Sequence, residues 1–81
     1  MNPPTLYNLT EIVGAYVDLA ALNVTEASTF GDDIPIDSQD MLRVVSRIRA
    51  VYGVTLNAPE LFQVATMGDL LAAVRRRMNT A

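Results

Sequence analysis

The chain has 81 residues, of which 51% are hydrophobic, a net charge of -3, and neither cysteine nor histidine. This length supports one domain on one hydrophobic core, near the lower limit for folding without disulfides or metals. The missing thiols and imidazoles exclude a disulfide framework, a cysteine nucleophile and the commonest general base and neutral metal ligand. All six basic residues are arginines, and the negative net charge argues against nucleic acid as the main partner, since phosphate binding needs a positive field.

Neither a membrane span nor a signal peptide is predicted. No apolar run approaches the roughly 18 residues that a membrane span requires. The first ten residues, "MNPPTLYNLT", lack the basic and then apolar segments of a signal peptide. We therefore expect a cytoplasmic, monomeric protein with no membrane partner. No linker composition is visible at either end, so we expect a single domain over residues 1–81 and a stand-alone protein.

The segment "NLTEIVGAYVDLAAL", residues 8–22, predicts the first helix. Its apolar residues recur at helical spacing, and they are Leu9, Ile12, Val13, Tyr16, Val17 and Ala20. Asn8 with Glu11 resembles a capping box, although Thr5 could start the helix earlier. Gly14 lowers the helical propensity without ending the pattern.

An irregular segment, residues 23–37, follows the first helix. Gly31, Pro35 and a cluster of aspartates are typical of a loop, and a loop of this length in a compact domain is usually functional. The plainer alternative is a crossover between distant helix ends. We expect its apolar residues, Phe30, Ile34 and Ile36, to anchor it to the core.

The second helix is predicted from Ser38 to Tyr52, with Gly53 ending it in the left-handed conformation. Its buried stripe is predicted to contain Met41, Val44, Val45, Ile48 and Tyr52. Its opposite face contains Gln39, Leu42, Arg43, Ser46, Arg47 and Ala50, and we expect Leu42 there to be exposed.

The remaining segment predicts an extended bridge, a short helix and a last helix. The short helix begins near Pro59, and its neighbourhood supplies Leu61, Phe62 and Val64, which we expect in the core. Thr66 with Asp69 predicts the cap of the last helix, whose core residues are Leu70, Leu71 and Val74. The predicted fold is all-α, a small four-helix bundle of three longer helices and one short one, with a long loop between the first two helices.

Ser38 is the residue on which a functional interpretation depends. Serine is a favoured helix N-cap, and Asp37 with Asp40 offers a second way to cap the same helix, so from spacing alone capping is the plainer role of Ser38. A serine hydrolase is excluded because the chain has no histidine and no G-x-S-x-G motif.

Two other charged clusters have plain explanations. The aspartates at positions 32, 33, 37 and 40 do not match the spacing of an EF-hand loop and lack its final glutamate, so no metal site is predicted. The arginines at positions 75–77 suit the negative end of a helix dipole.

The stretch "IDSQDMLRVVSRIRAVYGV" resembles the signature of the phosphopantetheine-dependent carrier proteins, whose usual core is Asp-Ser-Leu followed by an amphipathic helix. The stretch "GVTLNAPELFQVATMGDLLAAV" is similar to the family's third and fourth helices, so the resemblance covers nearly the whole chain. It implies that a transferase attaches 4'-phosphopantetheine, derived from coenzyme A, to Ser38. It also implies that Asp37 helps the transferase to recognise the site and position its metal.

The resemblance further implies a carrier rather than an enzyme, which holds intermediates as thioesters on the thiol of the arm. The implied partners are the phosphopantetheinyl transferase and acyl-processing enzymes: a ketosynthase, an acyltransferase or ligase, an adenylation enzyme and a thioesterase. The expected pathway is polyketide, fatty-acyl or nonribosomal peptide synthesis. The expected docking face consists of Gln39, Leu42, Arg43, Ser46 and Arg47, together with Ile34 and Ile36 of the loop.

Several residues depart from the family pattern. Gln39 replaces the usual leucine after the serine, which predicts a more polar contact with partners, and Pro35 stands near a common glycine. Arg43, Arg47 and Arg49 stand where carriers of fatty-acid synthesis usually have glutamates. In this respect the second helix resembles that of peptidyl carriers and of carriers of specialised metabolism, whereas the stretch "DDIPIDS" resembles discrete acyl carriers. For the arginines, the alternative is a solvated face with no role in partner recognition. For the protein, the alternatives are a peptidyl carrier and an unmodified helical interaction or scaffold module.

Overall fold

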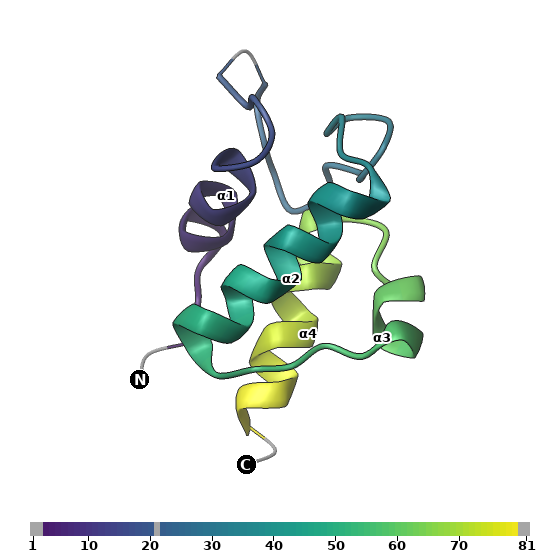
Figure 1. The fold of residues 1–81 in the computed structure, drawn as a ribbon. Helices are drawn as coiled ribbons and strands as arrows, with labels where there is room; N and C mark the ends of the chain where they lie inside the picture. Colours follow the sequence, from purple (N-terminus) through teal and green to yellow (C-terminus); the bar gives the residue numbers. More distant parts are fainter. Residues whose placement is uncertain (1–2, 21, 80–81) are drawn as a thin grey trace.

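The computed structural model describes residues 3–20 and 22–79, which form four helices (Figure 1). They are α1 (Leu6–Gly14), α2 (Ser38–Tyr52), α3 (Ala58–Phe62) and α4 (Met67–Asn79). The described ranges contain no strand, only two isolated β-bridges. The predicted all-α bundle, with its long loop between the first two helices, is confirmed.

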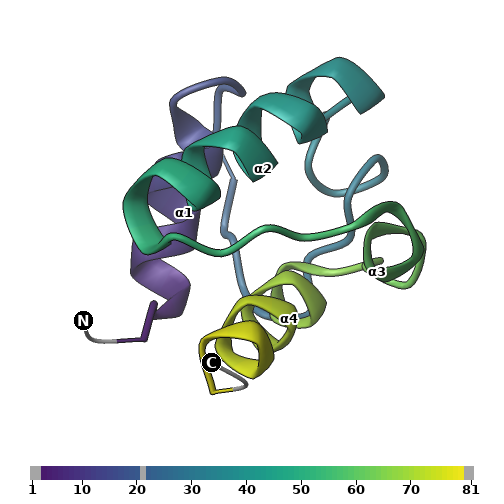
Figure 2. The same cartoon turned by 60° about the horizontal axis from the view of Figure 1, so that its bottom comes forward.

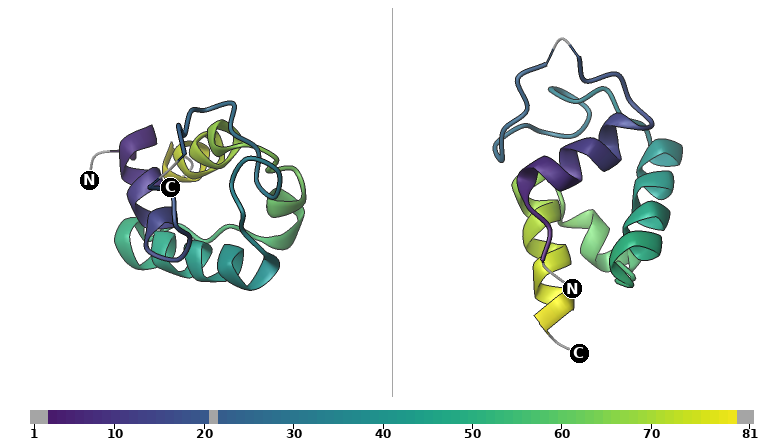
Figure 3. Two further views of the ribbon diagram at one scale, coloured as in Figure 1. Left: turned by 90° about the horizontal axis from the view of Figure 1, so that it is seen from above. Right: turned by 90° about the vertical axis from the view of Figure 1, so that its left-hand side faces the viewer.

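The helices enclose one core. In Figure 1, α2 crosses in front of α4, with α1 on one side of this pair and α3 on the other. α1 contacts both α2 and α4. The extended segment 53–57 carries the chain from the end of α2 to α3. α3 lies on the opposite side of the bundle from α1 (Figure 2). Figure 3 shows the same arrangement from two further directions, with the long loop covering one end of the bundle.

α1 begins earlier and ends earlier than the apolar pattern predicted. Thr5 is its N-cap: the Thr5 side chain accepts a hydrogen bond from the Asn8 amide at 3.2 Å, and Asn8 Oδ1 accepts one from the Thr5 amide at 3.0 Å. The Asn8–Glu11 capping box is therefore wrong, and the alternative start at Thr5 is right. The helix ends at Gly14, where glycine disfavours continuation.

Beyond Gly14 the chain turns so that Val17 still reaches the core, while Tyr16 is 37% exposed. The periodic pattern thus predicted the burial of Val17 correctly and the length of the helix incorrectly. Ala20 is exposed, outside any helix, and its amide donates to the Asp18 carboxylate at 3.0 Å. Ala21, also inside the predicted helix, lies outside the described residues.

α2 has the predicted limits. Gly53 follows it with φ = 69°, in the left-handed region that favours glycine, and its amide donates to the Arg49 carbonyl. Val44 and Ile48 are fully buried. Of the other stripe residues, Val45 and Tyr52 pack partly buried against the core, whereas Met41 is partly buried but is not part of the core cluster.

α4 is also as predicted. The Asp69 amide donates to Thr66 Oγ1 at 3.1 Å, and the Asp69 carboxylate accepts hydrogen bonds from the amides of Ala65 and Thr66. These backbone hydrogen bonds, from Ala65 first, lower the pKa of Asp69. The predicted core residues Leu70, Leu71 and Val74 are all buried.

α3 buries less than predicted. It has five residues, none of them fully buried, and Pro59 lies in its first turn as expected. Leu61 and Val64 pack partly buried against the core, but Phe62 is 88% exposed, so its predicted core position is wrong. Adjacent residues of a helix point about 100° apart, and in α3 it is Leu61 that turns toward the core while Phe62 turns toward solvent.

The long loop is anchored as expected and is also hydrogen-bonded to the start of α4. Ile34 is fully buried, and Phe30 and Ile36 pack partly buried against the core. The first amides of α4 donate into the loop: Met67 to the Ser28 carbonyl and Gly68 to the Glu26 carbonyl, each at 2.9 Å. Helix-start amides that lack intrahelical partners are satisfied in this way. The loop therefore has a defined path up to Ser38.

Alanine substitutions at two glycines should have opposite effects on stability, because only Gly68 touches the loop closely. A Cβ at Gly68 would lie 2.9 Å from the Glu26 carbonyl oxygen, so Gly68→Ala should lower the free energy of unfolding by about 1–3 kcal/mol. A Cβ at Gly14 would meet only Leu19 Cδ1 at 3.7 Å, so Gly14→Ala should raise it by about 0.5–1 kcal/mol. Urea unfolding followed by circular dichroism measures both, and equal effects of the two variants would contradict the packing described.

Candidate functional site

The loop becomes helix α2 at Asp37. Asp37 has extended backbone angles (φ -100°, ψ -179°), and its Oδ1 accepts a hydrogen bond from the Asp40 amide at 2.8 Å. The Asp37 carbonyl accepts the first helical hydrogen bond, from the Met41 amide at 2.9 Å. Asp37 is therefore the N-cap, and the plainer interpretation of Ser38 as the cap is wrong.

Ser38 is the first residue of α2 and is exposed. Within the described part of the chain its hydroxyl takes part in no hydrogen bond. Since Asp37 supplies the capping oxygen, substitution on the Ser38 hydroxyl would leave the start of α2 intact. The site thus presents an exposed hydroxyl on a fixed helix end.

An apolar groove of about 290 Å³ adjoins Ser38. Its walls come from two helices: Met41 and Leu42 of α2, and Ala58, Leu61 and Phe62 of α3. Leu42 is 61% exposed, as expected, and Phe62 forms the outer edge on the other side. Ser38 is thus a polar group at the end of an apolar surface.

The α3 wall of the groove is held by an ion pair. The Arg77 guanidinium of α4 donates to both carboxylate oxygens of Glu60, with Nε at 2.9 and 3.0 Å from them, and Arg76 lies 4.0 Å away. The hydrogen bond from Arg77 is the main cause that lowers the pKa of Glu60. Glu60 also accepts from the Asn57 amide in the capping box of α3. A helix without a fully buried residue is thereby tied to α4 by charge.

The docking residues predicted on α2 all lie on its exposed side. These are Gln39, Leu42, Arg43, Ser46 and Arg47. Of the two loop residues, Ile36 is partly buried and lies two residues before Ser38. Ile34 is fully buried, so its side chain belongs to the core and cannot contact a partner. Its predicted docking role is wrong for that reason.

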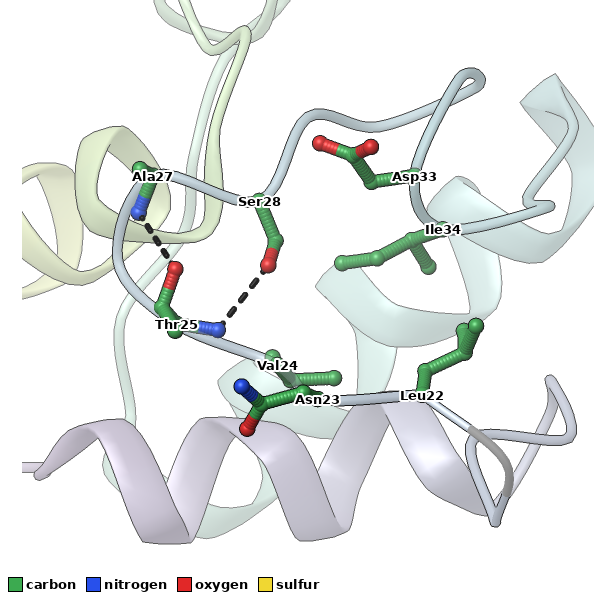
Figure 4. A pocket seen from close by; sticks show the side chains of 8 residues that line it. All are labelled: Leu22, Asn23, Val24, Thr25, Ala27, Ser28, Asp33 and Ile34. Atoms are coloured by element: carbon green, nitrogen blue, oxygen red, sulfur yellow. Dashed lines mark hydrogen bonds between the residues drawn. The ribbon is translucent and has the colours of Figure 1, made fainter.

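A second pocket, of about 340 Å³, lies inside the long loop (Figure 4). Several of its polar groups are hydrogen-bonded within the loop: the Thr25 amide donates to Ser28 Oγ at 2.9 Å, and the Asp33 carboxylate accepts from the Thr29 amide at 2.9 Å. The hydrogen bonds from Thr29 lower the pKa of Asp33. Across residues 3–20 and 22–79, acidic side chains form no group that could hold a metal ion. Ser38 and its groove are therefore the candidate site.

Comparison with known proteins identifies the family. Residues 8–74 match the family described as "Phosphopantetheine attachment site". The chain belongs to the phosphopantetheine-dependent carrier proteins. It is 32% identical to an acyl carrier protein of Renibacterium salmoninarum over 73 residues, 90% of each chain. It is 29% identical to a meromycolate extension acyl carrier protein of Mycolicibacterium aurum over 68 residues, 84% of this chain and 70% of that protein.

Carriers of this family are not catalysts; they carry a covalently attached 4'-phosphopantetheine and interact with acyl-processing enzymes. The residues of this carrier fit such a group. Ser38 offers an exposed hydroxyl that has no hydrogen-bond partner in residues 3–20 and 22–79, and the apolar groove beside it can accept part of a long arm. In the described parts of the carrier, no helix is long and apolar enough to span a membrane.

Two features of the site were not predicted from the sequence. The exposure of Phe62 depends on which side of α3 packs against the core, and two adjacent apolar residues, Leu61 and Phe62, do not indicate that side. The pairing of Glu60 with Arg77 joins residues 17 positions apart and depends on how α3 packs on α4, for which the sequence has no local signal.

The Glu60–Arg77 pair predicts a pH-dependent contribution to stability. Because the pKa of Glu60 is lower in the folded carrier, the contribution is complete above the ordinary glutamate value, about 4.5, and is lost as pH falls through the lowered folded value. Glu60→Gln removes it at all pH values.

The difference in urea midpoint between the wild type and Glu60→Gln should be constant from neutral pH down to about 5 and shrink on further acidification. Asp33 and Asp69 titrate in both proteins, so their effects cancel in this difference. A difference that does not change with pH would show that the ion pair does not stabilise the carrier.

Proposed function

We propose that this protein is an acyl carrier protein whose 4'-phosphopantetheine arm is attached to the hydroxyl of Ser38. The observation that carries the proposal is the division of roles at the start of α2. Asp37 caps the helix, which leaves Ser38 exposed and without a hydrogen-bond partner in the residues described. The match to the phosphopantetheine attachment family spans this position.

The position of Ser38 also suits the charge of the group. The first amides of a helix lack intrahelical partners, and the helix dipole is positive at this end, so a phosphodiester there is favoured. On attachment the Ser38 oxygen forms the phosphate ester and loses its proton, and the nucleotide part of coenzyme A leaves. The arm supplies the thiol for thioesters, which a chain without cysteine cannot supply itself.

We assign Asp37 a second role, in recognition by the phosphopantetheinyl transferase and its metal. Asp37 is exposed, and only its Oδ1 is used in the cap, so Oδ2 faces no partner among the described residues. Oxygen ligands are preferred by Mg²⁺, which keeps several waters and takes one or two carboxylates. Capping and recognition can therefore use different oxygens of one side chain.

Partner enzymes are proposed to dock on the exposed side of α2, at Gln39, Leu42, Arg43, Ser46 and Arg47, with Ile36 at the loop end. The relatives are named as acyl carriers, which favours an acyl cargo in a fatty-acyl or polyketide pathway, with a ketosynthase, an acyltransferase or ligase and a thioesterase as partners. The arginines of α2 favour the peptidyl carrier as the second candidate. Aminoacylation by an adenylation enzyme would support that candidate.

Modification of Ser38 is tested by intact-mass spectrometry after incubation with coenzyme A and a promiscuous phosphopantetheinyl transferase. The wild type should gain one phosphopantetheinyl group and Ser38→Ala none. Thr55→Ala, which removes an exposed hydroxyl elsewhere, should behave as the wild type. Gain of the group by Ser38→Ala, or its absence from the wild type, would remove the assignment.

Asp37→Asn separates the two roles of Asp37. Asparagine is as good an N-cap as aspartate, so the free energy of unfolding should change by less than about 0.5 kcal/mol, whereas Asp37→Ala should lose about 1 kcal/mol. Both variants lack the carboxylate and should be loaded by the transferase more slowly than the wild type. Loading of Asp37→Asn at the wild-type rate would restrict Asp37 to its capping role.

A further inference from the structure

The charges of this chain are segregated along its length. Residues 1–42 contain seven acidic residues and no basic one, whereas all six arginines follow position 42. Three of these arginines, Arg43, Arg47 and Arg49, are exposed on α2, whose only acidic residue is Asp40. The helix that begins at Ser38 is therefore a basic surface on an acidic protein.

The arginines of α2 are only partly neutralised within the chain. Arg43 lies 3.4 Å from the Asp40 carboxylate, an exposed pair of the kind that contributes little. In the described residues, Arg47 and Arg49 form no ion pair. Arg43 and Arg47 are one helical turn apart and therefore neighbours on the helix surface. Their combined field is available to a partner.

Exposed apolar side chains lie near Ser38 and next to Arg43. Leu42 is 61% and Phe62 is 88% exposed, and both line the groove that adjoins Ser38. Arg49 lies two turns beyond Leu42 on the same side of α2. We name these five residues the α2–α3 surface: Leu42, Arg43, Arg47, Arg49 and Phe62. Within it, Arg47 and Arg49 stand at opposite edges of the exposed side of α2, and Arg47 also lines a pocket with Glu11 of α1. Aromatic anchors next to charged rims are the usual composition of a protein-binding surface.

We propose that the α2–α3 surface binds partner enzymes that present an apolar recess bordered by aspartate and glutamate side chains. The recess receives Phe62 and Leu42, and the carboxylates face the three arginines. This inference rests on the proposed function, because docking there brings the arm on Ser38 to the partner. To the docking face proposed on α2, it adds the charge of the partner's surface and a role for Phe62 of α3.

Charge decides between the possible occupants of this surface. A second copy of the chain, paired through the same surface by a twofold axis, would place arginines opposite arginines, which is unfavourable. An acyl chain on the carrier's own arm would fill the groove and leave the arginines unmatched. A partner with a carboxylate rim satisfies both the apolar and the charged parts, and opposite charge also accelerates association.

The test uses the holo protein, whose formation is first confirmed by its mass. Two acyl-transferring enzymes of the same reaction serve as probes, one with a carboxylate-rimmed and one with a lysine- and arginine-rimmed entrance to its active site. We expect kcat/KM to be about tenfold higher with the carboxylate-rimmed enzyme and to fall as salt is raised.

Variants test the named residues on the carboxylate-rimmed enzyme. Arg47→Gln and Arg49→Gln should each raise KM about two- to fivefold with kcat unchanged. Asn23→Asp, which makes the same change in net charge on the distant loop, should have no effect. Phe62→Ser should raise KM about tenfold, as expected of a buried aromatic anchor. If Phe62→Ser does not fold, the KM values of the two arginine variants still test the proposed charge of the partner.

Four results would overturn the inference. They are a preference for the basic-rimmed enzyme, equal KM values for Arg47→Gln and Asn23→Asp, a dimer in analytical ultracentrifugation that Phe62→Ser dissociates, and a Phe62→Ser effect confined to hydrolysis of the carrier's own acyl thioester. The third would assign the surface to a second copy and the fourth to the acyl chain. If the holo protein does not form, the mass measurement shows this before any kinetic test, and the result contradicts the proposed function rather than this inference.

Discussion

The hydrogen bond from the Asp40 amide to the Asp37 carboxylate fixes the residue at which α2 begins. Because Asp37 stays extended and caps the helix, the next residue, Ser38, is helical, exposed and not needed for the cap. A serine that capped its own helix would lose that hydrogen bond when its oxygen became a phosphate ester. Here the cap is at Asp37 and the proposed attachment is at the next residue, so neither limits the other.

The fixed start of α2 depends in turn on the loop before it. The loop is held by the buried side chain of Ile34 and by amides of α4 that donate to its carbonyls. On the other side of Ser38, α3 has no fully buried residue and is held by Glu60 and Arg77. Segments with little buried surface open at low cost, which suits a wall of the groove if partners dock there as we propose. Ser38 therefore lies between a firmly anchored loop and the weakly held helix α3.

Much of this arrangement could be predicted from the sequence where one signal was strong. Gly53 fixed the end of α2, Thr66 with Asp69 indicated the start of α4, and apolar residues in the loop indicated its anchors. α1 was predicted too long because its apolar spacing continues past Gly14, whereas in the structure Val17 reaches the core from a turn.

The site itself was less predictable, because several of its features depend on tertiary contacts. Asp37 and Ser38 are equally good capping residues, and only the backbone path of the loop decides which one caps. Ile34 and Ile36 are alike in sequence, yet packing buries the first completely and leaves the second partly accessible. Phe62 has an apolar side chain typical of a core, but α3 packs Leu61 against the core instead. The attachment at Ser38 stays a prediction.

A phosphorus–proton correlation spectrum of the holo protein, recorded with amide exchange of the apo and holo forms, tests the central claim most directly. The account predicts that the phosphodiester correlates with the β protons of Ser38 and that the Asp40 amide is equally protected in both forms. Correlation with another residue, or loss of protection at Asp40 on modification, would contradict it.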